Sequence, residues 1–232
     1  VGRKRNMATP EEMQKIFQEI GKDYNYEFVT ADYMMFKEFK VRWQRSYRRI
    51  DFKVSDYFED APADVIRGLA ESLYARLAGQ EEKPYSKTMI DWITRPEFVH
   101  KKQPIFIRRS RNMLKTPIGN HINLEESYGR LIDKGLVERD PDILLTWSKD
   151  NPSRKAGNTS VLMKVVTMNN FLDSELVEDE LVDYCLFHQL NHIAAGFDPE
   201  GSGKSLKVFE MDKAFPAKDE AEALMDRFGL YL

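Results

Sequence analysis

The sequence predicts an α+β protein, with a helix-rich N-terminal portion followed by a small sheet that packs on a long helix. Residues 61–79 repeat apolar side chains at three- and four-residue spacing, as an amphipathic helix does. Three short runs have the alternating or apolar character of strands, and they lie at 50–54, 143–147 and 161–168. A second long helical pattern covers residues 175–195. Helices and strands that follow one another in this irregular order indicate the α+β class.

The N-terminal half is expected to contain one strand followed by one helix. The helix over 61–79 has Asp60 and Pro62 as start signals and Gly79 as a stop. Proline and glycine punctuate the following sequence, which predicts a loop or boundary zone over 95–120. We therefore expect two parts, a helix-rich portion with one strand-helix unit and a second domain, over residues 1–115 and 116–232.

The second domain is expected to hold the sheet and the long helix. Its other elements are expected in this order: a helix over 124–132, a strand over 143–147, a turn over 151–158, a longer strand over 161–168, a flexible connection over 201–203 and a last helix over 217–228. Ser174 is the predicted N-cap of the helix over 175–195, with Glu175 in its first turn, where a carboxylate favours the helix dipole.

Composition limits the class of protein. The net charge of −3 argues against a purely electrostatic nucleic-acid binder. No run of about 18 apolar residues occurs, which predicts a soluble chain with no membrane partner. Cys185 is the only cysteine, so no intrachain disulfide can form. We expect a reducing, cytoplasmic location.

A basic and aromatic segment over 37–53 admits two interpretations. Seven basic residues and two acidic ones lie there, and a second basic stretch follows over 95–115. As a nucleic-acid surface, the segment would place cations on phosphates and aromatic rings on bases; the candidate residues are Arg42, Trp43, Arg45, Arg48 and Arg49. As structure, Phe36, Phe39, Trp43 and Tyr47 recur at helical spacing, which predicts a buried helix face with solvated cations opposite. We prefer the structural interpretation.

The strongest chemical signal is a histidine pair in the predicted helix over 175–195. His188 and His192 are four residues apart, so both rings project from one helix face and could share a Zn²⁺ ion. In the HExxH motif of zinc peptidases the residue after the first histidine is a glutamate, which takes a proton from the metal-bound water. Here that residue is Gln189, and an amide cannot accept that proton. The sequence therefore predicts a candidate metal site without a general base.

Over roughly residues 50–232, the order of several short motifs resembles the archaeal and bacterial SprT-like family, related to YgjP-type zinc hydrolases. The matching segments are Ala61-Pro62 before the helix, Leu145-Thr146-Trp147, residues 153–157, Phe171-Leu172-Asp173, the 181–192 helix with its degenerate HExxH, and Phe215-Pro216. The resemblance implies a zincin-like small sheet packed on the motif helix. It also implies a third histidine ligand, but the matching positions hold Lys204 and Ser205, and no histidine follows His192.

The resemblance and these departures together predict a catalytically inactive relative of a metallopeptidase. His100 and His121 lie upstream in loop-like sequence; the conceivable replacement ligands are Asp198, Glu210 and Asp212. Such a chain would bind a protein partner or a nucleoprotein, and zinc is the candidate cofactor. The alternative function is a zinc-dependent peptidase or other hydrolase with an atypical ligand set.

Overall fold

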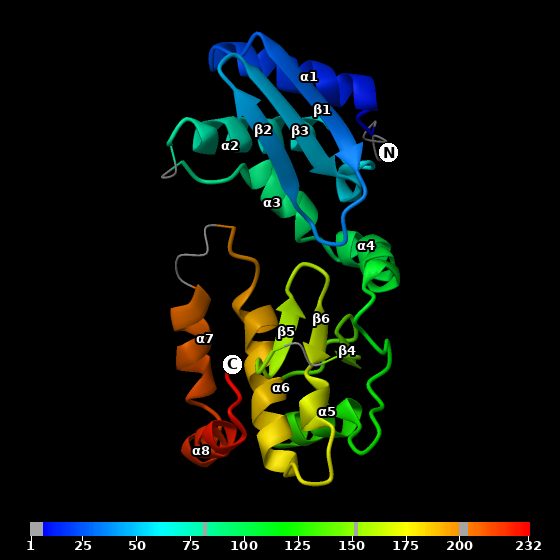
Figure 1. Ribbon diagram of the computed structural model, residues 1–232, viewed down its shortest axis with the longest axis vertical. Helices are drawn as coiled ribbons and strands as arrows, with labels where there is room; N and C mark the ends of the chain where they lie inside the picture. Colours follow the sequence, from blue (N-terminus) through cyan, green and yellow to red (C-terminus); the bar gives the residue numbers. More distant parts are fainter. Residues whose placement is uncertain (1–6, 81–82, 151–152, 200–203) are drawn as a thin grey trace. The chain divides into compact units, whose positions relative to one another are not determined.

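The chain forms two compact units, Val1–Phe98 and Val99–Leu232, in a computed structural model that describes residues 7–80, 83–150, 153–199 and 204–232 (Figure 1). The described residues include eight α-helices and two three-stranded mixed sheets, which confirms the α+β class. The boundary between the units lies between residues 98 and 99, earlier in the sequence than the expected boundary between residues 115 and 116. In that stretch the backbone belongs to the second unit, because Leu114 donates to the Trp147 carbonyl (2.9 Å) and Lys115 to the Thr146 hydroxyl (2.9 Å).

The first unit is a three-stranded sheet with helices on one face. Its strands are β1 (Phe28–Met34), β2 (Val41–Ser46) and β3 (Arg49–Ser55), in the order β1-β3-β2, with β1 parallel and β2 antiparallel to β3. Helices α1 (Pro10–Asp23) and α2 (Ala63–Leu77) pack together against that sheet, and α3 (Lys87–Ile93) packs on α2 (Figure 1). The predicted strand over 50–54 and the predicted helix over 61–79 are confirmed as β3 and α2.

Aromatic side chains from both layers form the core of the first unit. Phe17 of α1, Phe52 of β3 and Tyr74 of α2 are all buried and lie with ring centroids 4.9 to 6.4 Å apart. Burial of such rings supplies most of the stabilisation of a small sheet. The start of α1 is fixed by a capping box in which Glu12 N donates to the Thr9 hydroxyl and Thr9 N donates to the Glu12 carboxylate.

Two predictions for the first half of the chain are wrong. The aromatic segment over 36–47 is not a helix but leads into and forms β2, and Trp43 is 50% exposed. Aromatic spacing of three and four residues therefore arose from side chains in a loop, a strand and a turn. The expected loop zone over 95–120 is helical in its first part, since α4 runs over Pro96–Arg109 with Pro104 inside it.

The second unit packs its sheet on a central helix. Strands β4 (Leu144–Trp147), β5 (Gly157–Ser160) and β6 (Val165–Met168) lie in the order β4-β6-β5, with β5 at an edge. Helix α6 (Asp179–Ala195) packs against β5 and β6, and α7 (Lys204–Asp212) lies alongside it (Figure 1). Helices α5 (Leu124–Asp133) and α8 (Lys218–Phe228) complete the unit and confirm the two helices predicted there. Buried Trp147, Val166 and Leu186 belong to one hydrophobic core.

Three boundaries of the second unit differ from the prediction. The strand over 161–168 is instead the end of a hairpin, because Lys164 adopts a φ of +48° in the turn between β5 and β6. Helix α6 begins at Asp179 with Glu178 as N-cap, after a turn in which Val177 N bonds to the Ser174 carbonyl. The expected turn over 151–158 ends earlier than predicted, because β5 begins at Gly157. Residues 151–152 of that turn and the expected connection over 201–203 lie outside the described residues.

Candidate functional site

The two motif histidines lie on one face of α6 and meet each other. Nε2 of His188 and Nε2 of His192 are 3.2 Å apart, with the rings nearly perpendicular. One turn of helix separates the two residues, which is why their rings can touch. The histidine pair expected from the spacing is therefore a real side-chain cluster of the second unit.

A buried carboxylate orients this pair from the neighbouring helix. Asp212, the last residue of α7, accepts from His188 Nδ1 at 2.7 Å and from the Asn191 side-chain amide at 2.8 Å. A carboxylate only accepts hydrogen bonds, so His188 donates from Nδ1 and its Nε2 faces His192. A carboxylate on the outer nitrogen is the usual arrangement behind a metal-bound histidine.

Gln189, which follows His188 where the HExxH pattern has a glutamate, faces β5. Its side chain is buried (1% exposed), and the Thr159 hydroxyl donates toward the Gln189 side-chain Oε1 (2.9 Å) and backbone oxygen (3.1 Å). Gly157 makes room for it, because a Cβ on Gly157 would meet Gln189 Cγ at 3.1 Å. Thr159 and Gly157 together hold the amide against the strand.

The histidine pair fits part of a zinc shell. Two nitrogen ligands about 2.0–2.1 Å from a tetrahedral zinc lie roughly 3.3–3.4 Å apart, close to the observed 3.2 Å. Among the residues that the structure describes, no group of three or more histidine, cysteine, aspartate or glutamate side chains could hold a metal ion. The pair thus supplies two ligands of the three that a catalytic zinc takes from the protein.

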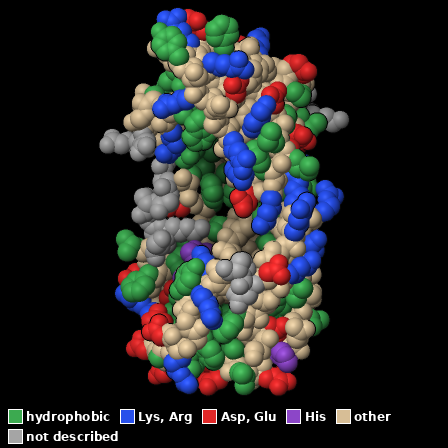
Figure 2. Space-filling model, in the orientation of Figure 1, with side chains coloured by type: hydrophobic (Ala, Val, Ile, Leu, Met, Phe, Trp, Pro, Cys, Tyr) green, Lys and Arg blue, Asp and Glu red, His purple; other side chains and the backbone are tan. Residues whose placement is uncertain are grey.

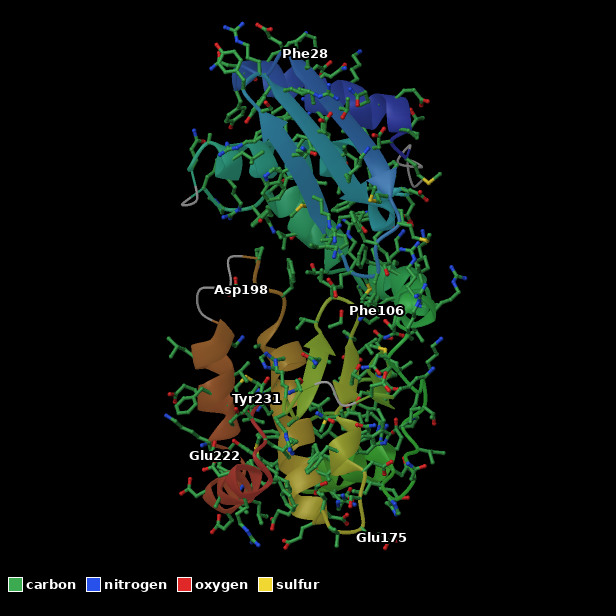
Figure 3. The ribbon with its side chains drawn as sticks, in the orientation of Figure 1. Phe28, Phe106, Glu175, Asp198, Glu222 and Tyr231 are labelled. Carbon is green, nitrogen blue, oxygen red and sulfur yellow. The ribbon has the colours of Figure 1, made fainter. Side chains whose placement is uncertain are left out.

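The three carboxylates considered as replacement zinc ligands are Asp198, Glu210 and Asp212, and their positions are as follows. Asp212 contacts Nδ1 of His188, on the side of the ring away from His192, so it supports the pair and does not complete it. Glu210 is exposed and pairs with Lys213 (2.7 Å). Asp198 lies in the loop that follows α6 (Figure 3). The side chains of Lys204 and Ser205, at the matching positions for a third ligand, lie outside the described ones.

The upstream histidines belong to separate parts of the second unit. His100 Nε2 lies 2.9 Å from an Asp142 oxygen, and this hydrogen bond is the first cause that lowers the pKa of the Asp142 carboxyl. His121 lies 3.4 Å from Glu175. Cys185 is on α6 one turn before Gln189, but it is buried and burial raises the pKa of its thiol to about 12. A thiol with that pKa is protonated at neutral pH and is a poor metal ligand.

The five candidate nucleic-acid residues lie on the β2–β3 hairpin of the first unit. Arg42 lies over the Phe36 ring (5.3 Å), and Trp43 pairs across the sheet with Phe52. Arg45 donates to the Leu77 carbonyl at the end of α2 (3.1 Å), so it has a structural role. Arg48 pairs with Glu27, and Arg49 with Asp51, whose pKa the Arg49 hydrogen bonds hold below its usual range.

Sequence reasoning did not identify several residues around both candidate sites. Thr159 and Gly157 hold Gln189. In the sequence they form only a Gly-x-Thr pattern in a polar segment, which does not predict a contact with Gln189. Tyr24 and Tyr26 lie near the hairpin turn, although they precede it by some twenty residues in the sequence. Such contacts depend on how the strands return on one another, which local spacing does not reveal.

Comparisons of the chain with protein-family models, with curated proteins and with solved structures find no match. None of the helices in the described residues is long and apolar enough to cross a membrane.

Proposed function

We propose that the second unit is a catalytically inactive, SprT-like metallopeptidase relative that binds a protein partner in extended form. The observation that carries the proposal is Gln189, held by Thr159 in the place of the catalytic base. The amide has no basic site at neutral pH, so a hydrolase would lack a contribution of about 10²–10⁴ to its rate. The fold and the histidine pair then serve binding.

The edge strand β5 supports a binding role. Just before this strand the C-terminal segment forms an isolated parallel bridge between Lys155 and Tyr231: Ala156 N donates to the Tyr231 carbonyl (2.7 Å), and Tyr231 N donates to the Arg154 carbonyl (3.0 Å). Figure 3 shows Tyr231 on the C-terminal segment that makes this contact. An extended peptide could continue the same pairing along Gly157–Ser160, since exposed sheet edges bind strands through their backbone groups.

A zinc-dependent hydrolase is the second candidate function. The 3.2 Å separation of the histidine Nε2 atoms and the Asp212 carboxylate behind His188 favour it, because both are features of zinc sites. If zinc binds, His188 and His192 hold it, and it would polarise a bound oxygen. Gln189 could orient that group by hydrogen bonding but could not remove its proton.

Binding of a permanently unfolded, fluorescently labelled protein tests the proposed role. Ala156 accepts from Asn169 of the β6 side, so by alternation the N–H of Thr159 points away from the sheet. Thr159→Pro removes the backbone N–H and the side-chain hydroxyl of Thr159. Thr159→Val removes the hydroxyl alone and keeps the N–H, so it is the matched control. We expect binding by the wild type and by Thr159→Val, and weaker binding by Thr159→Pro. Equal binding by all three variants, or none by the wild type, would contradict strand addition at β5.

A further inference from the structure

The turn end of the first unit combines aromatic rings with cations around an open pocket. The pocket has a volume of about 750 Å³, and its walls include Lys22, Tyr24, Tyr26, Glu27, Tyr47 and Arg48. These residues come from the last turn of α1 (Lys22), from the α1–β1 connection and from the β2–β3 turn, and the connection and the turn lie side by side in Figure 1. The pocket belongs wholly to the first unit, so it is independent of the histidine site.

Tyr47 is presented to solvent at the tip of the hairpin. Its side chain is 91% exposed, and its backbone has a φ of +42°. Glycine adopts this left-handed conformation readily, whereas a tyrosine is strained in it. The ring is almost fully outside the core, so burial does not compensate for the strain. Arg48, whose guanidinium lies 5.4 Å from the ring centroid, places a cation beside this aromatic surface.

The other wall of the pocket is braced from beneath. Tyr24 stacks on Tyr74 with centroids 5.4 Å apart, and Tyr26 lies 5.8 Å from the same ring. Tyr74 is buried in α2 and donates to the Phe17 carbonyl (3.0 Å), so it is held in place. Two partly exposed tyrosines on a fixed base form a ready surface for stacking, because little conformational freedom is lost when a ligand binds.

Positive charge continues from the pocket along the hairpin. Residues 40–53 contain six basic side chains and one acidic one, and four of the six pair with acidic residues: Lys40 with Glu38, Arg48 with Glu27, Arg49 with Asp51 and Lys53 with Asp32. Figure 2 shows basic side chains along the strands of this unit and hydrophobic side chains at its turn end. On the edge strand, Trp43 is 50% exposed, and Arg42, the residue before it, points to the opposite face of the strand. Four residues separate Trp43 from Tyr47 in the turn, so at about 3.3 Å per residue their Cα atoms lie at most roughly 13 Å apart.

From this combination we propose that the turn end of the first unit binds single-stranded nucleic acid. Bases stack on Tyr47 and on the Tyr24–Tyr26 wall, and Lys22, Arg42 and Arg48 contact phosphates. Exposed rings interleaved with cations suit a ligand that is both planar and anionic. Single strands fit better than duplexes, since the faces of paired bases are stacked on one another and unavailable to aromatic side chains.

The test measures anisotropy of labelled oligothymidylate, oligouridylate and a duplex of equal length, using the full chain at several salt concentrations. We expect single strands to bind more tightly than the duplex, with log affinity falling linearly in log salt. Tyr47→Gly suits the backbone and should leave the melting temperature equal or higher, while weakening single-strand binding by about 5- to 100-fold. Preference between the two single strands will tell DNA from RNA.

Charge variants locate the phosphate contacts. Lys22→Gln and Arg42→Gln should each lower the salt slope by about 0.7, whereas Lys87→Gln on α3, toward the other end of the unit in Figure 1, should leave it unchanged. Absence of single-strand binding at low salt would overturn the proposal. So would a wild-type affinity in Tyr47→Gly, or equal affinity for the duplex. Retention of binding in a His188→Ala variant is expected, because the histidine site lies in the other unit.

Discussion

His188 donates from Nδ1 to the buried Asp212 carboxylate at 2.7 Å, and this bond decides which ring nitrogen faces His192. The same carboxylate accepts from Asn191, so one residue of α7 ties down two of the four polar side chains in the motif. Asn191 is buried on α6 (2% exposed), and Asp212 supplies the partner that a buried amide needs.

Removal of this carboxylate should destabilise the second unit. In Asp212→Ala the His188 Nδ1–H and the Asn191 amide lose their partner in a buried position, at a cost of about 2–4 kcal/mol in the free energy of unfolding. Urea denaturation measures the change. Glu210→Ala is the matched control on the same helix, where loss of an exposed pair with Lys213 should cost under about 1 kcal/mol. Equal effects of the two variants would show that Asp212 does not hold the motif.

Thr159→Val should cost about 1–2 kcal/mol, because it leaves the buried Gln189 oxygen without its hydroxyl donor. The exposed neighbour offers a control in the same strand, and Asn158→Ala should change the free energy of unfolding by less than about 0.5 kcal/mol. A neutral Thr159→Val would mean that Gln189 is not held by the strand.

Gln189→Glu should not create a peptidase, because the described residues supply only two zinc ligands. It should instead make stability depend on pH. Burial raises the pKa of a carboxyl in the folded state, so the protonated form is favoured there. The variant should lose stability as pH rises from about 4 to 7 relative to wild type. Parallel pH profiles of the two proteins would contradict the burial of this side chain in solution.

Cys185 offers a readout of zinc binding, since it is the only cysteine and lies buried on α6. A disulfide reagent should label it only when the unit opens, because burial keeps the thiol protonated. With two strong ligands, zinc should slow labelling by less than about tenfold, since structural zinc draws its folding energy from a closed four-ligand shell. Strong protection that a chelator reverses would show that a complete site forms.

Local spacing predicted the elements in which one periodicity dominates. Val65, Leu69 and Leu73 repeat helically through α2, and the pair on α6 lies on one face as i and i+4 spacing requires. The β2–β3 hairpin was not predicted, because two patterns overlap in this segment. Val41, Trp43 and Arg45 lie at the two-residue spacing of a strand, whereas the aromatic residues over 36–47 recur at helical spacing. The second pattern crosses the turn at Tyr47, where regular structure stops.

The partners of the motif could not be read from the sequence. Asp212 was considered as a ligand from its place after His192, but its contact with Nδ1 depends on how α7 folds back on α6. Thr159 precedes Gln189 by 30 residues and meets it only because β5 is the edge strand beside α6. The beginning of α6 at Asp179 was also missed, since Ser174 has the chemistry of an N-cap and caps a turn instead.

Cleavage of an unfolded protein is the measurement that tests the proposed inactivity most directly. The purified chain is incubated with labelled substrate and added Zn²⁺ beside His188→Ala, and fragments are resolved by mass. We predict the same background in both, because neither protein has a base in the position of Gln189. Fragments produced by the wild type and absent from His188→Ala would contradict the proposed inactivity and establish a zinc-dependent peptidase.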